Sequence, residues 1–149
     1  MSQHVASQIL AAIESRLAAV APVYLLPVHA VALADLPGIF VESVEDETDE
    51  QLGRGPLQER HTLSFSLFGC VAATTGFQAV AGTLRTDIEK ALLATLNDIR
   101  LGGLCRPGLS RPSAAFRVEA DTLEKPVGGW VLKFTCVYQL KTDAPDTAI

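Results

Sequence analysis

The sequence has no apolar run that approaches the roughly 18 residues a helix needs to cross a membrane. Residues 17–34 come closest, and Pro22, Pro27 and His29 divide them into shorter pieces. The N-terminal stretch has no basic segment and carries Glu14 among its apolar residues, so a secretory signal is not expected. We therefore expect no membrane partner.

Cysteine and positive charge are both scarce. The three cysteines, Cys70, Cys105 and Cys136, are odd in number and widely spaced, which favours neither a disulfide framework nor a C-x-x-C metal site and indicates a reducing compartment. Lys and Arg number 12 against 17 Asp and Glu, which gives a net charge of −5. Because phosphate binding needs a positive field, nucleic acid is not expected as the main partner.

The motifs that usually carry catalysis or bind cofactors are incomplete. The stretch 108–112, with Ser110 at its centre, begins like a nucleophile elbow, but Pro112 replaces the final glycine. The glycines around residue 54 are not followed by the rest of a dinucleotide-binding pattern. The acidic stretch 46–51 lacks the glycine that a calcium loop has at its sixth position.

Histidine and cysteine side chains form no recognisable metal or catalytic set either. The histidines, among them His4 and His61, lie in separate elements, and we expect them at the surface or as helix caps. Cys70 and Cys136 fall within expected strands and should be buried, whereas Cys105 is in a loop and is the one expected to react. No catalytic residue, cofactor or metal ligand is therefore predicted.

The clearest element is an amphipathic helix over residues 75–97. Its apolar residues recur with a 3.6-residue period, and Thr75 to Gln78 fit a capping box. Gly102 and Gly103 supply a left-handed exit after it. Residues 3–20 show the same period and predict a first helix, with Ser2 as a possible cap.

The other segments alternate polar and apolar residues and are expected to form strands. Pro27 confines the strand at 23–34 to a sheet edge. The remaining strands are expected at 39–44, 60–72, 114–121 and 129–141. The order α-β-β-β-α-β-β predicts an α+β fold, with an antiparallel-rich sheet of about five strands and two helices. We expect one domain over residues 1–149, with an ordered core at about 3–141 and a flexible tail at 142–149.

Two expected loops differ in charge. The loop expected at 45–58 begins with the mostly acidic residues 45–50, and residues 100–113 carry three arginines. Either both loops are solvated and have no partner, or the opposite patches meet head-to-tail between copies, a heterologous contact that closes into a ring. The candidate assembly contacts are Glu45, Asp46, Glu47, Asp49, Glu50, Arg54, Arg100, Arg106 and Arg111.

Several short motifs follow one another in a recognisable order. After the first helix comes Asp35-Leu36-Pro37-Gly38-Ile39-Phe40-Val41 with its acidic stretch, and after the second helix comes Asp98-Ile99-Arg100-Leu101-Gly102-Gly103-Leu104. The last strand ends in Val137-Tyr138-Gln139-Leu140. Over about residues 3–141 the chain resembles the tail terminator proteins of long-tailed bacteriophages, of the lambda minor tail protein U type. Gly38 departs from the residue expected there, such as alanine.

This resemblance implies a structural virion protein without catalytic activity. It implies a hexameric ring that caps the tail tube, stops polymerisation of the tube subunit and presents a surface for head attachment. The implied partners are further copies of the chain, the tail tube protein and a head-completion protein. The implied location is the virion tail, after assembly in the host bacterial cytoplasm. The alternatives are a related tail-completion or head–tail joining protein, and a small α+β ligand-binding or enzymatic domain with a pocket between helix and sheet.

Overall fold

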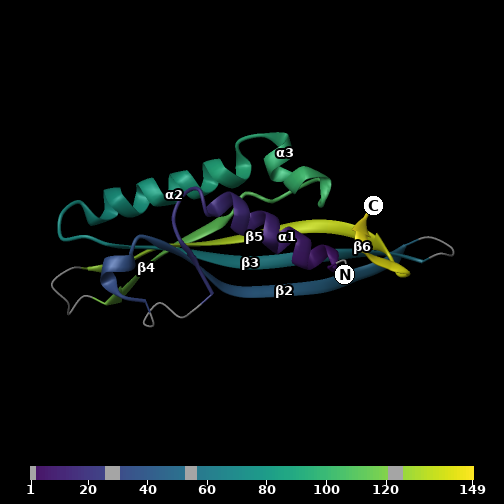
Figure 1. Cartoon of the computed structure of the whole chain (residues 1–149), viewed down its shortest axis with the longest axis horizontal. Coiled ribbons are helices and arrows are strands. Elements are labelled where there is room, and N and C mark those ends of the chain that lie inside the picture. The colour runs from purple at the N-terminus through teal and green to yellow at the C-terminus, as the bar shows by residue number, and fades with distance from the viewer. Residues whose placement is uncertain (1–2, 26–30, 53–56, 121–125) are drawn as a thin grey trace.

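The computed structural model describes residues 3–25, 31–52, 57–120 and 126–149, shown in Figure 1. The expected α+β class is confirmed. In chain order the elements are α1 (Val5–Leu17), β1 (Val23–Tyr24), the 3-10 turn η2 (Leu33–Asp35), β2 (Gly38–Leu52), β3 (Gln58–Ala72), α2 (Phe77–Leu93), α3 (Leu96–Ile99), the 3-10 turn η3 (Leu101–Gly103), β4 (Ser113–Ala120), β5 (Val127–Lys141) and β6 (Ala144–Ala148).

The strands form one curled sheet in the order β1-β2-β3-β5-β4, and β6 also pairs with β5. The sheet is mixed, because β1 runs parallel to β2, so the prediction of an antiparallel-rich sheet is wrong. The predicted element order is not confirmed either, because α3 and β6 are additional elements. Residues 144–148, expected in a flexible tail, instead pair with Leu140 and Lys141 of β5.

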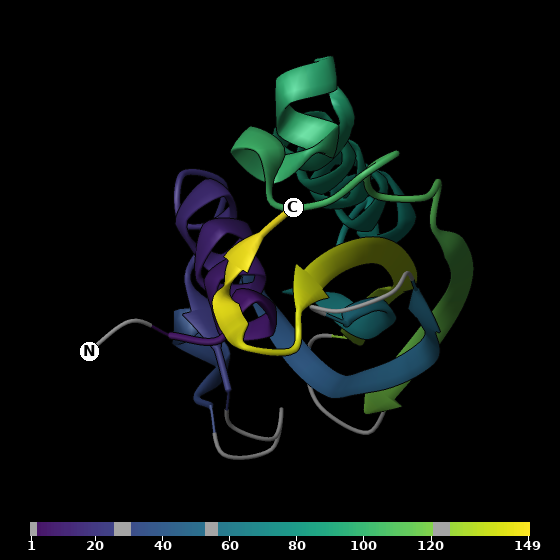
Figure 2. The same cartoon turned by 90° about the vertical axis from the view of Figure 1, so that its right-hand side faces the viewer.

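Both long helices lie on one face of the sheet, as Figures 1 and 2 show. Val5, Ile9, Ile13 and Leu17 of α1 are at most 2% exposed, and Ala81, Leu84, Ile88 and Leu92 of α2 are buried with them. These side chains pack on apolar residues of β3 and β5 in a single core cluster. The helical periods read from the sequence are therefore confirmed. Among the described residues, no helix has the length and apolar character needed to span a membrane.

A smaller cluster lies on the opposite face of the sheet, at the end near β1. It consists of Phe40, Phe68, Cys70 and Val127, with Tyr24 packed against it. Since the larger cluster occupies the other face, β3 is buried on both faces from Phe65 to Val71. The expected half-buried alternation holds only over the first half of β3, where Thr62 and Ser64 are less buried than Leu63.

The ends of α2 differ from their prediction. The helix begins at Phe77 after Gly76, whose backbone is left-handed (φ 62°), and no side chain caps it. It ends at Leu93, and Thr95 instead caps the short α3 by accepting a hydrogen bond from the Asp98 amide (3.1 Å). Gly102 and Gly103 do have positive φ, as expected, but they follow α3. A left-handed residue directly before Phe77 is incompatible with the extended N-cap geometry of a capping box.

Candidate assembly interface

The acidic candidates lie in a strand, not in the predicted loop. Glu45, Asp46, Glu47 and Asp49 are all within β2, and their backbones pair with residues 62–64 of β3 or lie beside this register. Glu50 is also in β2, and Arg54 lies outside the described residues. Acidic residues are poor strand formers in isolation, but the ladder to β3 overrides that preference. The acidic charge is therefore carried along a strand.

Of the four side chains Glu45, Asp46, Glu47 and Asp49, the two aspartates have hydrogen-bond partners and the two glutamates do not. The Asp46 carboxylate accepts a hydrogen bond from the Tyr138 hydroxyl (2.7 Å), and Asp49 accepts one from the Thr62 hydroxyl. Within the described part of the chain, Glu45 and Glu47 have neither a side-chain hydrogen bond nor an ion pair, and both are exposed. Among the acidic side chains of β2 that the structure describes, only Glu45 and Glu47 therefore have no partner.

Asp46 belongs to a partly buried polar cluster that the sequence did not reveal. His61, expected at the surface, is only 6% exposed and stacks on the Tyr138 ring at 4.9 Å between centroids. One of its ring nitrogens lies 2.9 Å from a Glu59 carboxylate oxygen, and the other lies 3.4 Å from Asp46. Burial, together with the bond to Asp46, raises the pKa of Tyr138.

His4 has the cap role that the sequence predicts as one of two possibilities. Its Nδ1 accepts a hydrogen bond from the Ala6 amide (3.0 Å) at the start of α1. Its ring also makes edge contacts with the rings of His61 and Tyr138, 6.3 and 6.2 Å between centroids. The start of α1 thereby contacts the two buried rings of this polar cluster. The alternative cap, Ser2, lies outside the described residues.

The basic candidates lie along the opposite side of the sheet. The Arg106 amide donates to the Val137 carbonyl (3.0 Å), and the Ser110 amide donates to the Thr135 carbonyl (2.9 Å). This segment therefore runs beside β5 as an irregular continuation of β4. Arg106 and Arg111 are exposed and form no ion pair with the other described residues. Arg100 is partly buried, and its Nε donates to the Pro107 carbonyl (3.5 Å), so it braces this segment.

Cys105 does not have the exposed loop position that its expected reactivity requires. It is 1% exposed, and its thiol donates to the Ile99 carbonyl (3.5 Å). The neighbouring Cys105 thiol, together with burial, raises the pKa of the Cys136 thiol. Burial also raises the pKa of Cys70 to about 12. All three cysteines are buried free thiols, as was expected for Cys70 and Cys136 but not for Cys105.

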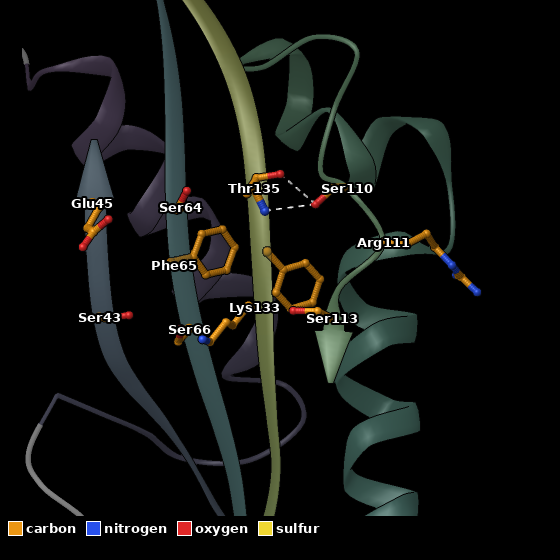
Figure 3. A pocket seen from close by; sticks show the side chains of 11 residues that line it. Ser43, Glu45, Ser64, Phe65, Ser66, Ser110, Arg111, Ser113, Lys133 and Thr135 are labelled. Atoms are coloured by element: carbon orange, nitrogen blue, oxygen red, sulfur yellow. Dashed lines mark hydrogen bonds between the residues drawn. The ribbon is translucent and has the colours of Figure 1, made fainter. Parts of the chain in front are cut away.

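The helix-free face of the sheet holds an open polar trough of about 500 Å³, shown in Figure 3. Two rows of cross-strand neighbours form its floor. One row runs Ser43, Ser66, Lys133 and Ser113, and the other runs Glu45, Ser64 and Thr135. Ser110 extends the second row, because its hydroxyl accepts hydrogen bonds from the amide and the hydroxyl of Thr135 (3.0 Å each). Glu45 and Arg111 thus lie at opposite sides of this trough.

One long-range contact across this face was also missed. Arg117 of β4 extends across β5, where its ladder partner Gly129 has no side chain. Its guanidinium lies 3.9 Å from the centroid of the Phe68 ring and donates to both carboxylate oxygens of Glu42 on β2. Side chains this far apart in sequence leave no local signal of their pairing. The contact joins both sides of the curled sheet.

Two kinds of reactive group can be checked in the described residues, a metal site and an activated serine. They contain no group of three or more His, Cys, Asp or Glu placed to hold a metal ion. Ser110, at the centre of the incomplete nucleophile elbow, is hydrogen-bonded to Thr135, and no histidine is among the described residues that line the trough with it. The geometry instead separates charge. Described acids without a partner lie on one edge strand, and described arginines without an ion pair lie at the opposite edge.

The chain was also compared with known protein families and with curated proteins. No known protein family matches the chain, and no curated protein matches it.

Proposed function

We propose that this protein is a ring-forming structural protein of a bacteriophage or prophage tail, a tail terminator. The observation that carries the proposal is the separation of unpartnered charge onto opposite edges of one sheet. Glu45 and Glu47 lie on β2, and Arg106 and Arg111 lie on the segment leading into β4. A surface with opposite charges on opposite sides is complementary to a translated or rotated copy of itself.

Such complementarity favours a heterologous contact. In a two-fold dimer the same patch meets itself, which would place Glu45 and Glu47 near their own equivalents at an energetic cost. In a head-to-tail contact each acidic edge meets a basic edge, and a suitable rotation closes the series into a ring. A ring built this way needs no catalytic group, and its remaining surfaces are available to other proteins.

In the proposed role, a hexameric ring binds the end of the tail tube, stops further addition of tube subunits and presents a surface to a head-completion protein. The resemblance of the sequence to tail terminators supports this role. Two of the short motifs that carry it lie in turns: Leu36–Pro37 precedes β2, and the 98–104 motif covers the end of α3 and η3. The protein would act in the virion tail, after assembly in the bacterial cytoplasm.

The alternative of a small ligand-binding or enzymatic domain requires a pocket between helix and sheet. In the described structure the space between the helices and the sheet is filled by the main core cluster, and the polar trough is on the other face. The geometry therefore favours assembly over small-molecule binding. A related head–tail joining protein would share the ring but would not stop tube growth.

Sedimentation velocity and electron microscopy, with and without purified tail tubes, test this proposal. We expect hexameric rings at raised concentration or magnesium, or on the tube ends, and shorter tubes when the protein is added during tube polymerisation. A protein that stays monomeric even when tail tubes are present would contradict the proposal. Rings that leave tube length unchanged would favour the head–tail joining alternative.

A further inference from the structure

We infer that the polar trough binds a phosphorylated polyhydroxy compound, with the phosphate of the ligand at Lys133 and its hydroxyl groups toward Glu45. The trough lies on the helix-free face of the sheet, between the two edges assigned to the proposed ring, so this binding goes beyond the proposed function. The site is an open one on the outer face, distinct from a pocket between helix and sheet.

Ser66, on the floor of the trough, is a buried polar residue without a partner. It is only 8% exposed, yet its hydroxyl makes no hydrogen bond to any residue that the structure describes. A buried hydroxyl without a hydrogen bond is costly, and native proteins rarely leave one unsatisfied. Since Ser66 lines the trough, its hydrogen bonds must be made with whatever fills the trough.

Lys133 lies beside Ser66 and supplies a positive charge. Ser66 and Ser113 are the cross-strand neighbours of Lys133 on its two sides. In Figure 3 the Lys133 side chain extends from β5 toward Ser66 on β3. Within the described ranges, Lys133 forms no ion pair. An ammonium group with a hydroxyl on each side suits an oxyanion, because lysine supplies the charge and the serines supply directed hydrogen bonds.

The number of donors favours a phosphate group over a carboxylate. A phosphomonoester presents three terminal oxygens, one for Lys133 and one each for Ser66 and Ser113, whereas a carboxylate presents two. Arg111 does not share this role, because its side chain points away from the trough toward α2 (Figure 3). Among the described residues that line the trough, Lys133 is therefore the one cation that faces it.

The other end of the trough carries an acceptor. Glu45 lies one row further along and two strands away from Lys133, which places their Cα atoms about 12 Å apart at ordinary strand spacings. Its carboxylate is exposed and has no partner in the part of the chain that the structure covers. A carboxylate repels an anion but accepts hydrogen bonds from hydroxyl groups. The trough therefore suits a ligand with an anion at one end and hydroxyl groups at the other.

The size of the trough agrees with such a ligand. Its volume of about 500 Å³ is within the range of about 300–1,000 Å³ that is usual for small-molecule sites. A single phosphate ion bound at Lys133 would leave the hydroxyls of Ser43 and Ser64 and the Glu45 carboxylate without a ligand contact. A hydroxylated compound that spans both rows would contact all three groups.

Calorimetric titration of the full chain with glucose 6-phosphate tests the site. Inorganic phosphate and glucose are the matched partial ligands, and they separate a phosphorylated compound from free phosphate as the source of the oxyanion. We expect glucose 6-phosphate to bind at least about tenfold more tightly than inorganic phosphate, because it also makes the hydroxyl contacts, and glucose to show no measurable binding. Titrations belong at a protein concentration where sedimentation shows a single species, because Glu45 is also a proposed ring contact.

The variant Lys133→Met keeps the stem of the side chain and removes its charge. It should weaken the binding of both phosphate-bearing ligands by about tenfold or more, and Ser66→Ala should weaken it by about fivefold. The matched control is Lys141→Met. Lys141 is an exposed lysine on the same face of β5, eight residues and roughly 26 Å from Lys133, so this variant should leave both affinities unchanged.

Glu45→Gln tests the other end of the ligand. It should weaken glucose 6-phosphate by about fivefold, because a neutral amide is a poorer acceptor for hydroxyl groups than a carboxylate. Inorganic phosphate should bind this variant as it binds the unmodified chain. Its position at Lys133 is further from Glu45 than the Debye length of about 8 Å at physiological salt, so the repulsion that is removed is already screened.

Failure of this site and failure of the ring are seen in different measurements. Absence of glucose 6-phosphate binding, or equal losses in Lys133→Met and Lys141→Met, would overturn the site. Equal affinities for glucose 6-phosphate and inorganic phosphate, or a Glu45→Gln variant with unchanged affinity for glucose 6-phosphate, would overturn the hydroxylated ligand. Ring formation is followed separately by sedimentation, where Lys133→Met should assemble like the unmodified chain.

Discussion

Removing the Arg117 side chain should destabilise the folded chain measurably. Arg117 and Glu42 are 35% and 28% exposed at their side chains, so solvent screens their ion pair and its contribution is about 0.5–1 kcal/mol. The cation–π contact with the buried Phe68 ring contributes about another 0.5–1 kcal/mol. Arg117→Ala should therefore cost about 1–2 kcal/mol, which corresponds to a fall of about 2–8 °C in Tm for a chain of this size.

A double-mutant cycle measured by urea unfolding isolates the ion pair. Arg117→Ala, Glu42→Gln and the combined variant should give a coupling energy of about 1 kcal/mol, because the two residues are in direct contact. The coupling should decrease at high salt, since screening weakens partly exposed pairs. Measurements belong at a protein concentration where sedimentation shows a single species, so that association does not add to stability.

Arg117→Met is the control that separates charge from packing. A methionine stem still covers Phe68, so this variant should recover part of the loss seen with alanine while showing no coupling to Glu42. A coupling energy below about 0.3 kcal/mol, the usual error of such cycles, would show that the Arg117–Glu42 ion pair does not stabilise the fold in solution.

Three further predictions follow from buried positions. A Cβ at Gly129 would lie 1.8 Å from the Gly69 carbonyl oxygen, so Gly129→Ala should cost about 3 kcal/mol or more. Gly82 is a helical position of α2 where an added Cβ meets no other atom, so Gly82→Ala should stabilise the fold by about 0.5–1 kcal/mol. Equal unfolding midpoints for the two variants would contradict both predictions. Tyr138→Phe should lower the free energy of unfolding by about 1–2 kcal/mol through the lost bond to Asp46, as measured by urea titration. The raised pKa of Tyr138 means that its stabilising contribution is complete below pH 10 and is lost as pH rises above that value, so the alkaline decline should be smaller in the Phe variant. The pKa of Cys70 rises from 9.0 to about 12, so stability should also decline between pH 9 and 12, and native Cys70 should resist alkylation at pH 9 that rapidly modifies the unfolded chain.

The residue patterns that predicted elements correctly are those with a short period. Every third or fourth residue of α1 from Val5 to Leu17 is buried, and the alternation of β5 from Leu132 to Leu140 is equally regular. Burying one face of a helix or a strand requires only that period, whatever the partner element is. The α+β class follows from the same information.

The sequence identified the acidic segment correctly but predicted the wrong backbone conformation for it, a loop in place of a strand. The stretch from Glu45 to Asp49 resembles a solvated loop, because acidic side chains have low strand propensity and no apolar face marks the period. Its strand exists because β3 supplies a ladder to it, a condition set by a separate segment. For the same reason, the sequence could not show that Asp46 contacts Tyr138 whereas Glu45 and Glu47 remain without partners.

By itself the sequence determined the helix faces, the main strands, the acidic and basic segments and the scarcity of catalytic motifs. Only the tertiary structure decided that the two charged segments lie on opposite edges of one sheet and share its cross-strand rows. It also decided that Cys105 and His61 are buried. These outcomes depend on pairings between residues far apart in the chain, and the alignment of a row follows from the register of three strands together, which no local pattern encodes.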